Sequence, residues 1–138
     1  MPIAPLQTPP LHIRPVVPAQ RAALLALAVE TGLFAADDAE ALLGGVLDAS
    51  AADALEPGHA AVCCVGEASD APLGWAYFAP DPHAQGVWNL WWIGAHPDAQ
   101  GQGAGAALLA HAERAAAQAG ARIMIIETSD QPPTARAR

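Results

Sequence analysis

Three closely spaced glycines, Gly101, Gly103 and Gly105, separate an apolar segment from an alanine-rich one. The apolar segment, residues 87–95, holds three tryptophans and has the length and composition of a strand. After the glycines, apolar residues recur at helical spacing on one face: Leu108, Leu109, Ala112, Ala116 and Ala119. Glycines at a strand-to-helix turn let backbone N–H groups approach an anion, and the helix N-terminus adds the positive end of its dipole. The turn therefore predicts a site for a phosphate-bearing ligand that needs no lysine.

The length of 138 residues predicts a single domain, which we expect to span residues 1–138. Six basic residues, all of them arginine, stand against fourteen acidic residues, so the net charge is −8. Nucleic acid requires a basic surface on its partner, so this composition argues against nucleic acid as a partner. An acidic surface either attracts a cationic substrate or only keeps the protein soluble, and the composition leaves both open.

The chain shows no membrane or secretion signal. Its longest strongly apolar run, residues 22–29, is far shorter than the roughly 18 residues of a membrane span. Residues 1–10 hold four prolines and no lysine or arginine, so we expect a flexible tail and a cytoplasmic protein with no membrane partner. Cys63 and Cys64 are adjacent and should point to opposite faces of a strand, which precludes a disulfide between them. The five histidines lack metal-ligand spacing, so we expect no metal site.

The N-terminal half has the pattern of a strand followed by two helices. We expect the strand over residues 11–17 and a helix that begins at Pro18 and ends at Gly32. Asp37 and Glu40 have the spacing of a capping box, which predicts the start of the second helix. The apolar face of that helix comprises Leu42, Leu43, Val46 and Leu47.

The second half begins with strand periodicity. Residues 60–65, 73–79 and 87–95 are three strand candidates joined by short segments rich in turn-forming residues. Short connections imply antiparallel neighbours, because a parallel crossover needs a dozen or more residues. Residues 122–127 form a last apolar strand, parallel to its predecessor if the helix is the crossover. The predicted fold class is mixed α/β, with a mostly antiparallel sheet and flanking helices.

Two cofactor families use a glycine turn of this kind. Gly101, Gly103 and Ala106 fit the dinucleotide-binding pattern G-x-G-x-x-A, and Glu127 lies about 20 residues further on. Against this interpretation, residues 96–100 separate the strand from the first glycine, and an antiparallel meander precedes it instead of a repeated βαβ unit. A dinucleotide-binding protein is therefore the less favoured alternative.

The second family fits more of the chain. Gln100, Gly103 and Gly105 give the pattern Q-x-x-G-x-G, preceded by Trp-Trp-Ile-Gly-Ala-His-Pro over residues 91–97 and followed by a double leucine. This stretch resembles the acetyl-CoA-binding motif of the GNAT superfamily of N-acetyltransferases, and the order of strands and helices agrees with that family. The resemblance covers residues 11 to about 127. It implies the acyl-CoA N-acyltransferase fold, in which two parallel strands splay apart at the cofactor site.

The resemblance also implies direct transfer of an acetyl group from acetyl-CoA to a primary amine of a small molecule or peptide. Backbone groups of Ile93 and Ala95, on either side of Gly94, would hold the pantetheine and polarise the thioester. The pyrophosphate would lie on the turn made by Gln100, Gly101, Gln102, Gly103, Ala104, Gly105 and Ala106. The attacking amine must be uncharged, so an alkylammonium with a pKa of about 10 first has to lose a proton.

Two residues are candidates for a role at the acceptor amine. In the histone-acetylating branch of the family a glutamate base stands eleven residues before the motif glutamine, and Asn89 occupies that position here. An amide is no base, so Asn89 either orients the amine or a water, or it satisfies a backbone group. Glu127, near the point where the strands part, is the candidate carboxylate, and a solvated strand-end charge is its alternative. We expect Trp88, Trp91 and Trp92 to pack in the core.

The end of the chain departs from the family pattern. Residues 130–138 predict the start of a helix that is then incomplete, whereas the resemblance implies a full helix and a closing strand. The strand at residues 122–127 would then expose an apolar edge, so we expect a homodimer that covers it. A non-catalytic CoA-binding remnant of the family is the alternative to an active enzyme.

Overall fold

The computed structural model describes residues 11–32, 34–66, 71–96 and 103–126. Five strands and the helices around them account for most of these residues. In chain order the elements are β1 (Leu11–Pro15), a 3-10 turn (Pro18–Gln20), α1 (Arg21–Glu30), α2 (Ala36–Ala39), a π-helical turn (Glu40–Gly44), α3 (Gly45–Ala51), β2 (Ala60–Gly66), β3 (Pro72–Pro80), β4 (Val87–Ala95), α4 (Ala104–Gln118) and β5 (Ile123–Ile126). The predicted mixed α/β class is therefore confirmed. The expected N-terminal tail and the start of a last helix lie outside the described residues.

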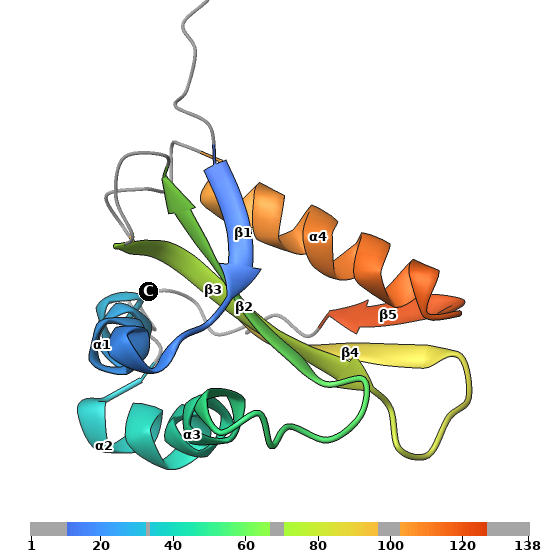
Figure 1. Cartoon of the computed structure of the whole chain (residues 1–138), viewed down its shortest axis with the longest axis horizontal. Helices are drawn as coiled ribbons and strands as arrows, with labels where there is room; N and C mark the ends of the chain where they lie inside the picture. Colours follow the sequence, from blue (N-terminus) through green and yellow to red (C-terminus); the bar gives the residue numbers. More distant parts are fainter. Residues whose placement is uncertain (1–10, 33, 67–70, 97–102, 127–138) are drawn as a thin grey trace, which may run out of the picture.

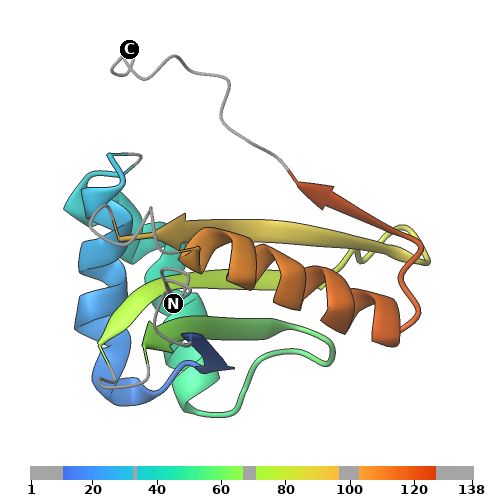
Figure 2. The same ribbon diagram turned by 90° about the horizontal axis from the view of Figure 1, so that it is seen from above.

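The five strands form one sheet in which spatial order follows chain order. Neighbours from β1 to β4 are antiparallel, and β5 is parallel to β4. Helices α1 to α3 lie on one side of the sheet, and α4, the crossover between β4 and β5, lies on the other (Figures 1 and 2). Within the described ranges, no helix is both long and apolar enough to cross a membrane.

Each face of the sheet has its own apolar core. We call the side packed against α1 to α3 the α1 face and the other side the α4 face. Cys63 is buried in the core of the α1 face and Cys64 in that of the α4 face, so the predicted opposite orientation of the two thiols is confirmed. On the α1 face, the buried Trp75 indole N–H donates to the Leu24 carbonyl at 3.1 Å, which fixes α1 on the sheet.

The predicted helix ends are confirmed at two glycines. Gly32, just after α1, has a φ of +84°, and Gly120, just after α4, has a φ of +99°. At the end of α4, the N–H of Gly120 donates to the Ala117 carbonyl at 3.0 Å and that of Ala121 to the Ala116 carbonyl at 2.9 Å. These two bonds close the helix in a Schellman motif, which requires the left-handed conformation at Gly120.

The predicted capping box at Asp37 and Glu40 is wrong. Helix α2 begins at Ala36, and its N-cap, Ala35, makes no side-chain capping bond. The Glu40 carboxylate instead accepts hydrogen bonds from the Arg21 guanidinium on α1, and these bonds lower its pKa. A charged partner from another helix therefore replaces the local cap, because a charge-assisted bond is stronger than a neutral one.

Gly74 on β3 lies where β4 and α4 pack most closely against it. A Cβ at this position would lie 2.7 Å from the Gly94 carbonyl oxygen and 3.0 Å from Leu108 Cδ1. We expect Gly74→Ala to lower the free energy of unfolding by about 1–3 kcal/mol, because the backbone oxygen has no room to move away. Gly45→Ala in α3 is the control, since its Cβ would meet open space, and it should change stability by at most about 1 kcal/mol, in the stabilising direction. Urea unfolding measures both, and equal stability of the two variants would contradict this packing.

Candidate functional site

Strand β4 is paired with β3 along its length but with β5 only along its first half. On the β3 side the register extends from Trp88 to Ala95, whereas β5 pairs only with residues 87–90. Strand β5 ends at Ile126, the residue that pairs with Leu90. In the part of the chain that the structure describes, no strand pairs with the outer edge of residues 91–95. The parallel pairing of β4 with β5 that the sequence predicts is thus confirmed.

A β-bulge lies just beyond Leu90, the last residue of β4 that pairs with β5. The pairing with β3 skips Trp91, which is therefore an extra residue in β4. The extra residue turns Trp92 onto the α1 face, where its ring is buried 5.4 Å from Phe34 and 5.8 Å from Trp75. Trp91 itself is 56% exposed, so the expected core position is wrong for this residue, whereas Trp88 and Trp92 are buried as predicted.

The last residues of β4 turn alternate backbone groups toward and away from β3. The N–H of His96 donates to the Leu73 carbonyl at 2.7 Å, which makes this a hydrogen-bonded pair. Hydrogen-bonded and non-bonded pairs alternate along antiparallel strands, so the N–H and C=O of Ile93 and Ala95 point away from β3. The backbone of Gly94, between them, faces β3. The outer edge of β4 therefore presents donors and acceptors with which an extended ligand can pair.

Helix α4 begins near the end of β4 (Figure 2). Gly103, which precedes the helix, has a φ of +84°, a conformation that L side chains rarely adopt. The first intrahelical bond runs from the N–H of Ala107 to the Gly103 carbonyl at 2.9 Å, so the N–H groups of Ala104, Gly105 and Ala106 have no partner within the helix. These donors and the helix dipole favour an anion at this end. The other predicted turn residues, Gln100, Gly101 and Gln102, lie outside the described residues.

Asn89 lies on the α1 face, since its neighbours in β4 pack on the α4 face, and it is only 7% exposed. Its Nδ2 donates to Asp81 Oδ2 at 3.0 Å, and Asp81 Oδ1 accepts the N–H of His83 at 2.8 Å. Both bonds favour the carboxylate and hold the pKa of Asp81 below its usual range. A carboxylate only accepts, so the amide nitrogen of Asn89 is fixed toward Asp81 and its Oδ1 points elsewhere. The partner of Asn89 is thus a side chain and not a backbone group.

A second polar group on the α1 face connects β3 to the loop before β2. Tyr77 Oη lies 2.5 Å from His59 Nδ1, and His59 Nε2 lies 3.6 Å from a carboxylate oxygen of Glu56. Burial raises the pKa of Tyr77, and the Glu56 charge raises it further, so the phenol is neutral at pH 7. Carboxylate, imidazole and phenol thus form a chain of three titratable groups.

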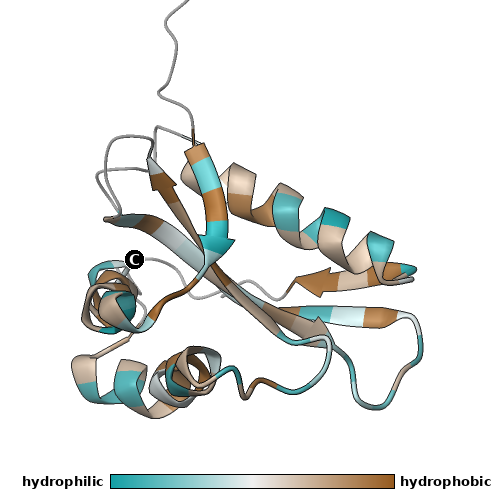
Figure 3. Cartoon of the chain, in the orientation of Figure 1, coloured by the Kyte–Doolittle hydropathy of each residue, from teal (hydrophilic) through white to brown (hydrophobic). Residues whose placement is uncertain are grey.

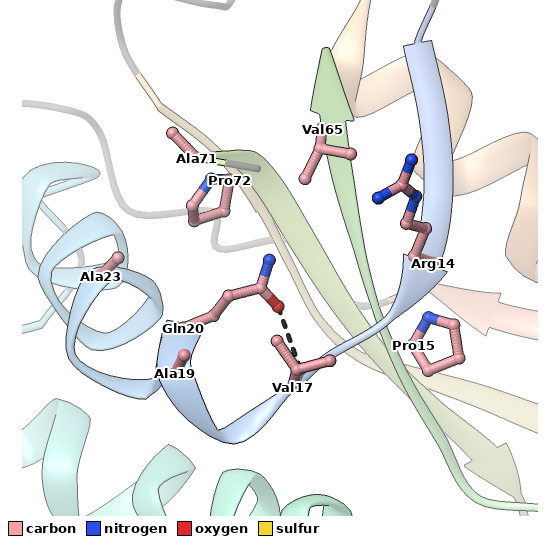
Figure 4. A pocket seen from close by; sticks show the side chains of 9 residues that line it. All are labelled: Arg14, Pro15, Val17, Ala19, Gln20, Ala23, Val65, Ala71 and Pro72. Carbon is pink, nitrogen blue, oxygen red and sulfur yellow. Dashed lines mark hydrogen bonds between the residues drawn. The ribbon is translucent and has the colours of Figure 1, made fainter. Parts of the chain in front are cut away.

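A cavity in another part of the described chain does not border β4. A shallow cavity of about 450 Å³ lies between β1, α1 and the adjoining ends of β2 and β3, and Gln20 in its wall accepts the N–H of Val17 (Figure 4). Its lining is mostly apolar and includes no residue of β4 or α4. Over the described ranges, no three histidine, cysteine or acidic side chains come together in a group that could hold a metal ion.

The model of the acetyltransferase (GNAT) family matches residues 22–137. The chain belongs to the GNAT acetyltransferase family. Among curated proteins, none matches it.

Solved structures share the GNAT fold. A protein assigned to the GNAT acetyltransferases, from Desulfovibrio desulfuricans, is 27% identical with a TM-score of 0.78 over 92% of this chain and 80% of that one. A GNAT acetyltransferase from Brucella melitensis, solved with acetyl-CoA, is 21% identical with a TM-score of 0.63 over 93% and 82% of the two chains. The aminoglycoside N-acetyltransferase AAC(6')-Iy, solved with the bisubstrate analogue CoA-S-monomethyl-acetylneamine, is 17% identical with a TM-score of 0.64 over 92% and 85%.

Sequence reasoning missed several polar residues of this GNAT chain. Asp81 bonds Asn89 on the α1 face, and His59 meets Tyr77 on the same face. The signal that was available is the lone tyrosine in an otherwise apolar strand. Glu127, the predicted carboxylate, lies outside the described residues.

Asn89→Ala removes one of the hydrogen bonds that Asp81 accepts. We expect the pKa of Asp81 to rise toward its usual value, because the bond from Asn89 contributes most to lowering it. A carboxyl with a lowered folded-state pKa stabilises the fold at pH values above its unfolded-state pKa. This stabilisation is lost as the pH falls through the folded-state pKa, so the variant should lose less stability than the wild type over that acidic range. An NMR titration of the side-chain carboxyl measures the pKa.

Gln85→Ala is the control for this titration. Gln85 lies in the same loop, and its backbone carbonyl accepts the bond from Arg122, so the substitution leaves the contacts of Asp81 in place. The pKa of Asp81 should not change in this variant. The same unchanged value in Asn89→Ala would contradict the Asn89–Asp81 contact.

Proposed function

We propose that this protein is an acetyl-CoA-dependent N-acetyltransferase that transfers the acetyl group directly to a primary amine of a small molecule or peptide. The observation that carries the proposal is the unpaired outer edge of β4. Backbone polar groups inside a protein need partners, and the amide groups of pantetheine match the N–H and C=O of Ile93 and Ala95. Gly94, between them, leaves room for the Trp92 ring, which a Cβ at this position would approach to 2.5 Å.

The N-terminus of α4 supports a place for the pyrophosphate of the cofactor. Gly103, Ala104, Gly105 and Ala106 supply backbone donors and the helix dipole, and the sequence adds Gln100, Gly101 and Gln102. The sequence has no lysine. Backbone N–H groups would therefore bind the phosphates in place of the basic side chains that do so in other phosphate sites.

Asn89 supports the acceptor side of the proposal. Because Asp81 holds its Nδ2, its Oδ1 is available to accept a hydrogen bond from the incoming amine. Asn89 would therefore orient the amine beside the outer edge of β4. We also propose Glu127 as the carboxylate on the acceptor side.

Gly103→Val tests the cofactor site. Valine does not readily adopt a φ of +84°, so we expect the variant to lose CoA affinity by about tenfold or more while the fold persists. Calorimetric titration with CoA measures the affinity. Mass spectrometry of primary amines incubated with acetyl-CoA and the wild-type protein measures transfer.

Gly120→Val is a matched control, because this glycine has a φ of +99° at the other end of the same helix. Both variants should lose stability, but only Gly103→Val should lose CoA affinity. Equal CoA affinity in the two variants would contradict the cofactor site. CoA binding by the wild type without transfer to any amine would reduce the function to that of a CoA-binding protein.

We also propose a homodimer in which a second copy covers β5. This last strand of the sheet has three exposed side chains, Ile123, Ile125 and Ile126, and is almost wholly apolar (Figure 3). An exposed apolar strand at a sheet edge tends to pair with another chain. Light scattering should show a dimer of the 14.1 kDa chain, and Ile123→Lys should convert it to a monomer. Leu42→Lys, at an exposed position outside the sheet, should leave the dimer intact, and a wild-type monomer would contradict the proposal.

A further inference from the structure

We propose that Tyr77 and His59, assisted by Glu56, take the proton from the acceptor amine before it attacks acetyl-CoA. The inference rests on the proposed function and adds the proton acceptor to it. The geometry that points to this role is the contiguous chain of phenol, imidazole and carboxylate, with its 2.5 Å and 3.6 Å contacts. In many enzymes a nucleophile gives its proton to a base, and a third group orients that base. The same three roles are present here.

Strand register places Tyr77 on the strand next to β4. Tyr77 is the residue of β3 that pairs with Trp92, next to the bulge. Ala79, two residues further along β3, pairs with Asn89 on β4, and His59 directly precedes Ala60, which pairs with Phe78 of β3. Tyr77 packs on the α1 face, where Asn89 also lies. An amine held by Asn89 would therefore lie on the same face of the sheet as Tyr77.

The partners of His59 determine which atom carries the proton. Glu56 faces Nε2 and can only accept, so the hydrogen of the neutral imidazole belongs on Nε2. Nδ1 then offers a lone pair, and the neutral Tyr77 hydroxyl donates to it. In this arrangement the phenol oxygen keeps a lone pair with which it accepts a proton from an ammonium group.

Each proton of the reaction has a destination in this arrangement. The ammonium gives one proton to Tyr77 Oη as the phenol passes its own proton to His59 Nδ1, and Glu56 stabilises the imidazolium that forms. The amine nitrogen then bonds to the thioester carbon, and collapse of the tetrahedral intermediate breaks the C–S bond. The second proton on nitrogen goes to the leaving thiolate, and His59 returns its proton to solvent. The products are the N-acetylamine, CoA thiol and one proton.

The surroundings of the pair favour this direction of transfer. The charged and titratable groups on the neighbouring elements are Glu56 before β2, Cys63 on β2, Asp48 on α3 and Asp81 after β3. Arg21 bonds Asp48 and Asn89 bonds Asp81. Among the described residues, Glu56 is the charged group that acts on the phenol. Glu56 also lies 3.6 Å from Nε2 of His59, whereas Tyr77 contacts Nδ1.

Acetyl transfer to n-propylamine tests the relay, because so small an amine needs no dedicated pocket. At saturating acetyl-CoA, we expect the wild-type kcat to rise with pH through one ionisation and to level off below the amine's own pKa of about 10. Tyr77→Phe and His59→Gln should lower kcat about 100- to 1,000-fold near neutral pH, with KM for acetyl-CoA unchanged. Their rates should keep rising up to the pKa of the free amine and there approach the wild-type rate. Thiol release and the mass of the product measure the reaction.

Two further variants separate a lost base from a damaged fold. His12→Gln, on β1, removes a histidine that is no part of the pair and should keep the wild-type profile. His59→Gly should be inactive near neutral pH and should regain activity with added imidazole. Thermal unfolding of each variant checks that it folds.

The outcomes distinguish the relay from the function on which it rests. A loss by the same factor at every pH in Tyr77→Phe and His59→Gln would overturn the relay and leave the pair a structural role. A wild-type pH profile in either variant would also overturn the relay. If Glu127→Gln were the only variant to lose the ionisation, the base would be Glu127 and the relay would be overturned as well. Wild-type protein that binds acetyl-CoA but acetylates no propylamine at any pH would overturn the proposed function, and the relay with it.

Discussion

Strand β4 pairs with two neighbouring strands, β3 and β5, over different lengths. Along its first half, hydrogen bonds on both edges hold it inside the sheet, and beyond Leu90 only the β3 edge is paired within the described residues. Unpaired backbone groups in the interior are costly unless a ligand or water satisfies them. The bulge at Trp91 lies at this transition. The candidate cofactor edge and the candidate acceptor face meet there for the same reason.

The two faces of the sheet differ in composition: the core of the α4 face is apolar, whereas the α1 face also carries polar side chains. The α4 face is apolar throughout its core, and close contacts such as that of Gly74 with the β4 backbone and Leu108 hold α4 against the strands. The α1 face combines an apolar core around Trp75 with polar side chains near the ends of the strands. Because successive strand residues alternate between faces, a single strand such as β4 supplies both the core and the polar group Asn89.

The composition is consistent with recognition by backbone groups. A chain without lysine, with a net charge of −8, has few cations to offer a polyanionic cofactor. A glycine-initiated helix and an unpaired strand edge offer N–H groups whose positions the fold determines. Some of the acidic groups make structural contacts, such as those of Glu40 and Asp48 with Arg21.

The sequence by itself determined the class of fold, the order of elements and the ends of α1 and α4, because periodicity and glycine conformation are local properties. It also placed Ile93, Ala95 and Asn89 on the strand that borders the candidate site. Tertiary structure alone decided which residues surround that strand. Glu40 bonds Arg21 instead of capping its own helix, Trp91 becomes exposed through a bulge, and His59 meets Tyr77 across two strands. Such contacts depend on register and on packing between distant segments, and neither is written in the spacing of neighbouring residues.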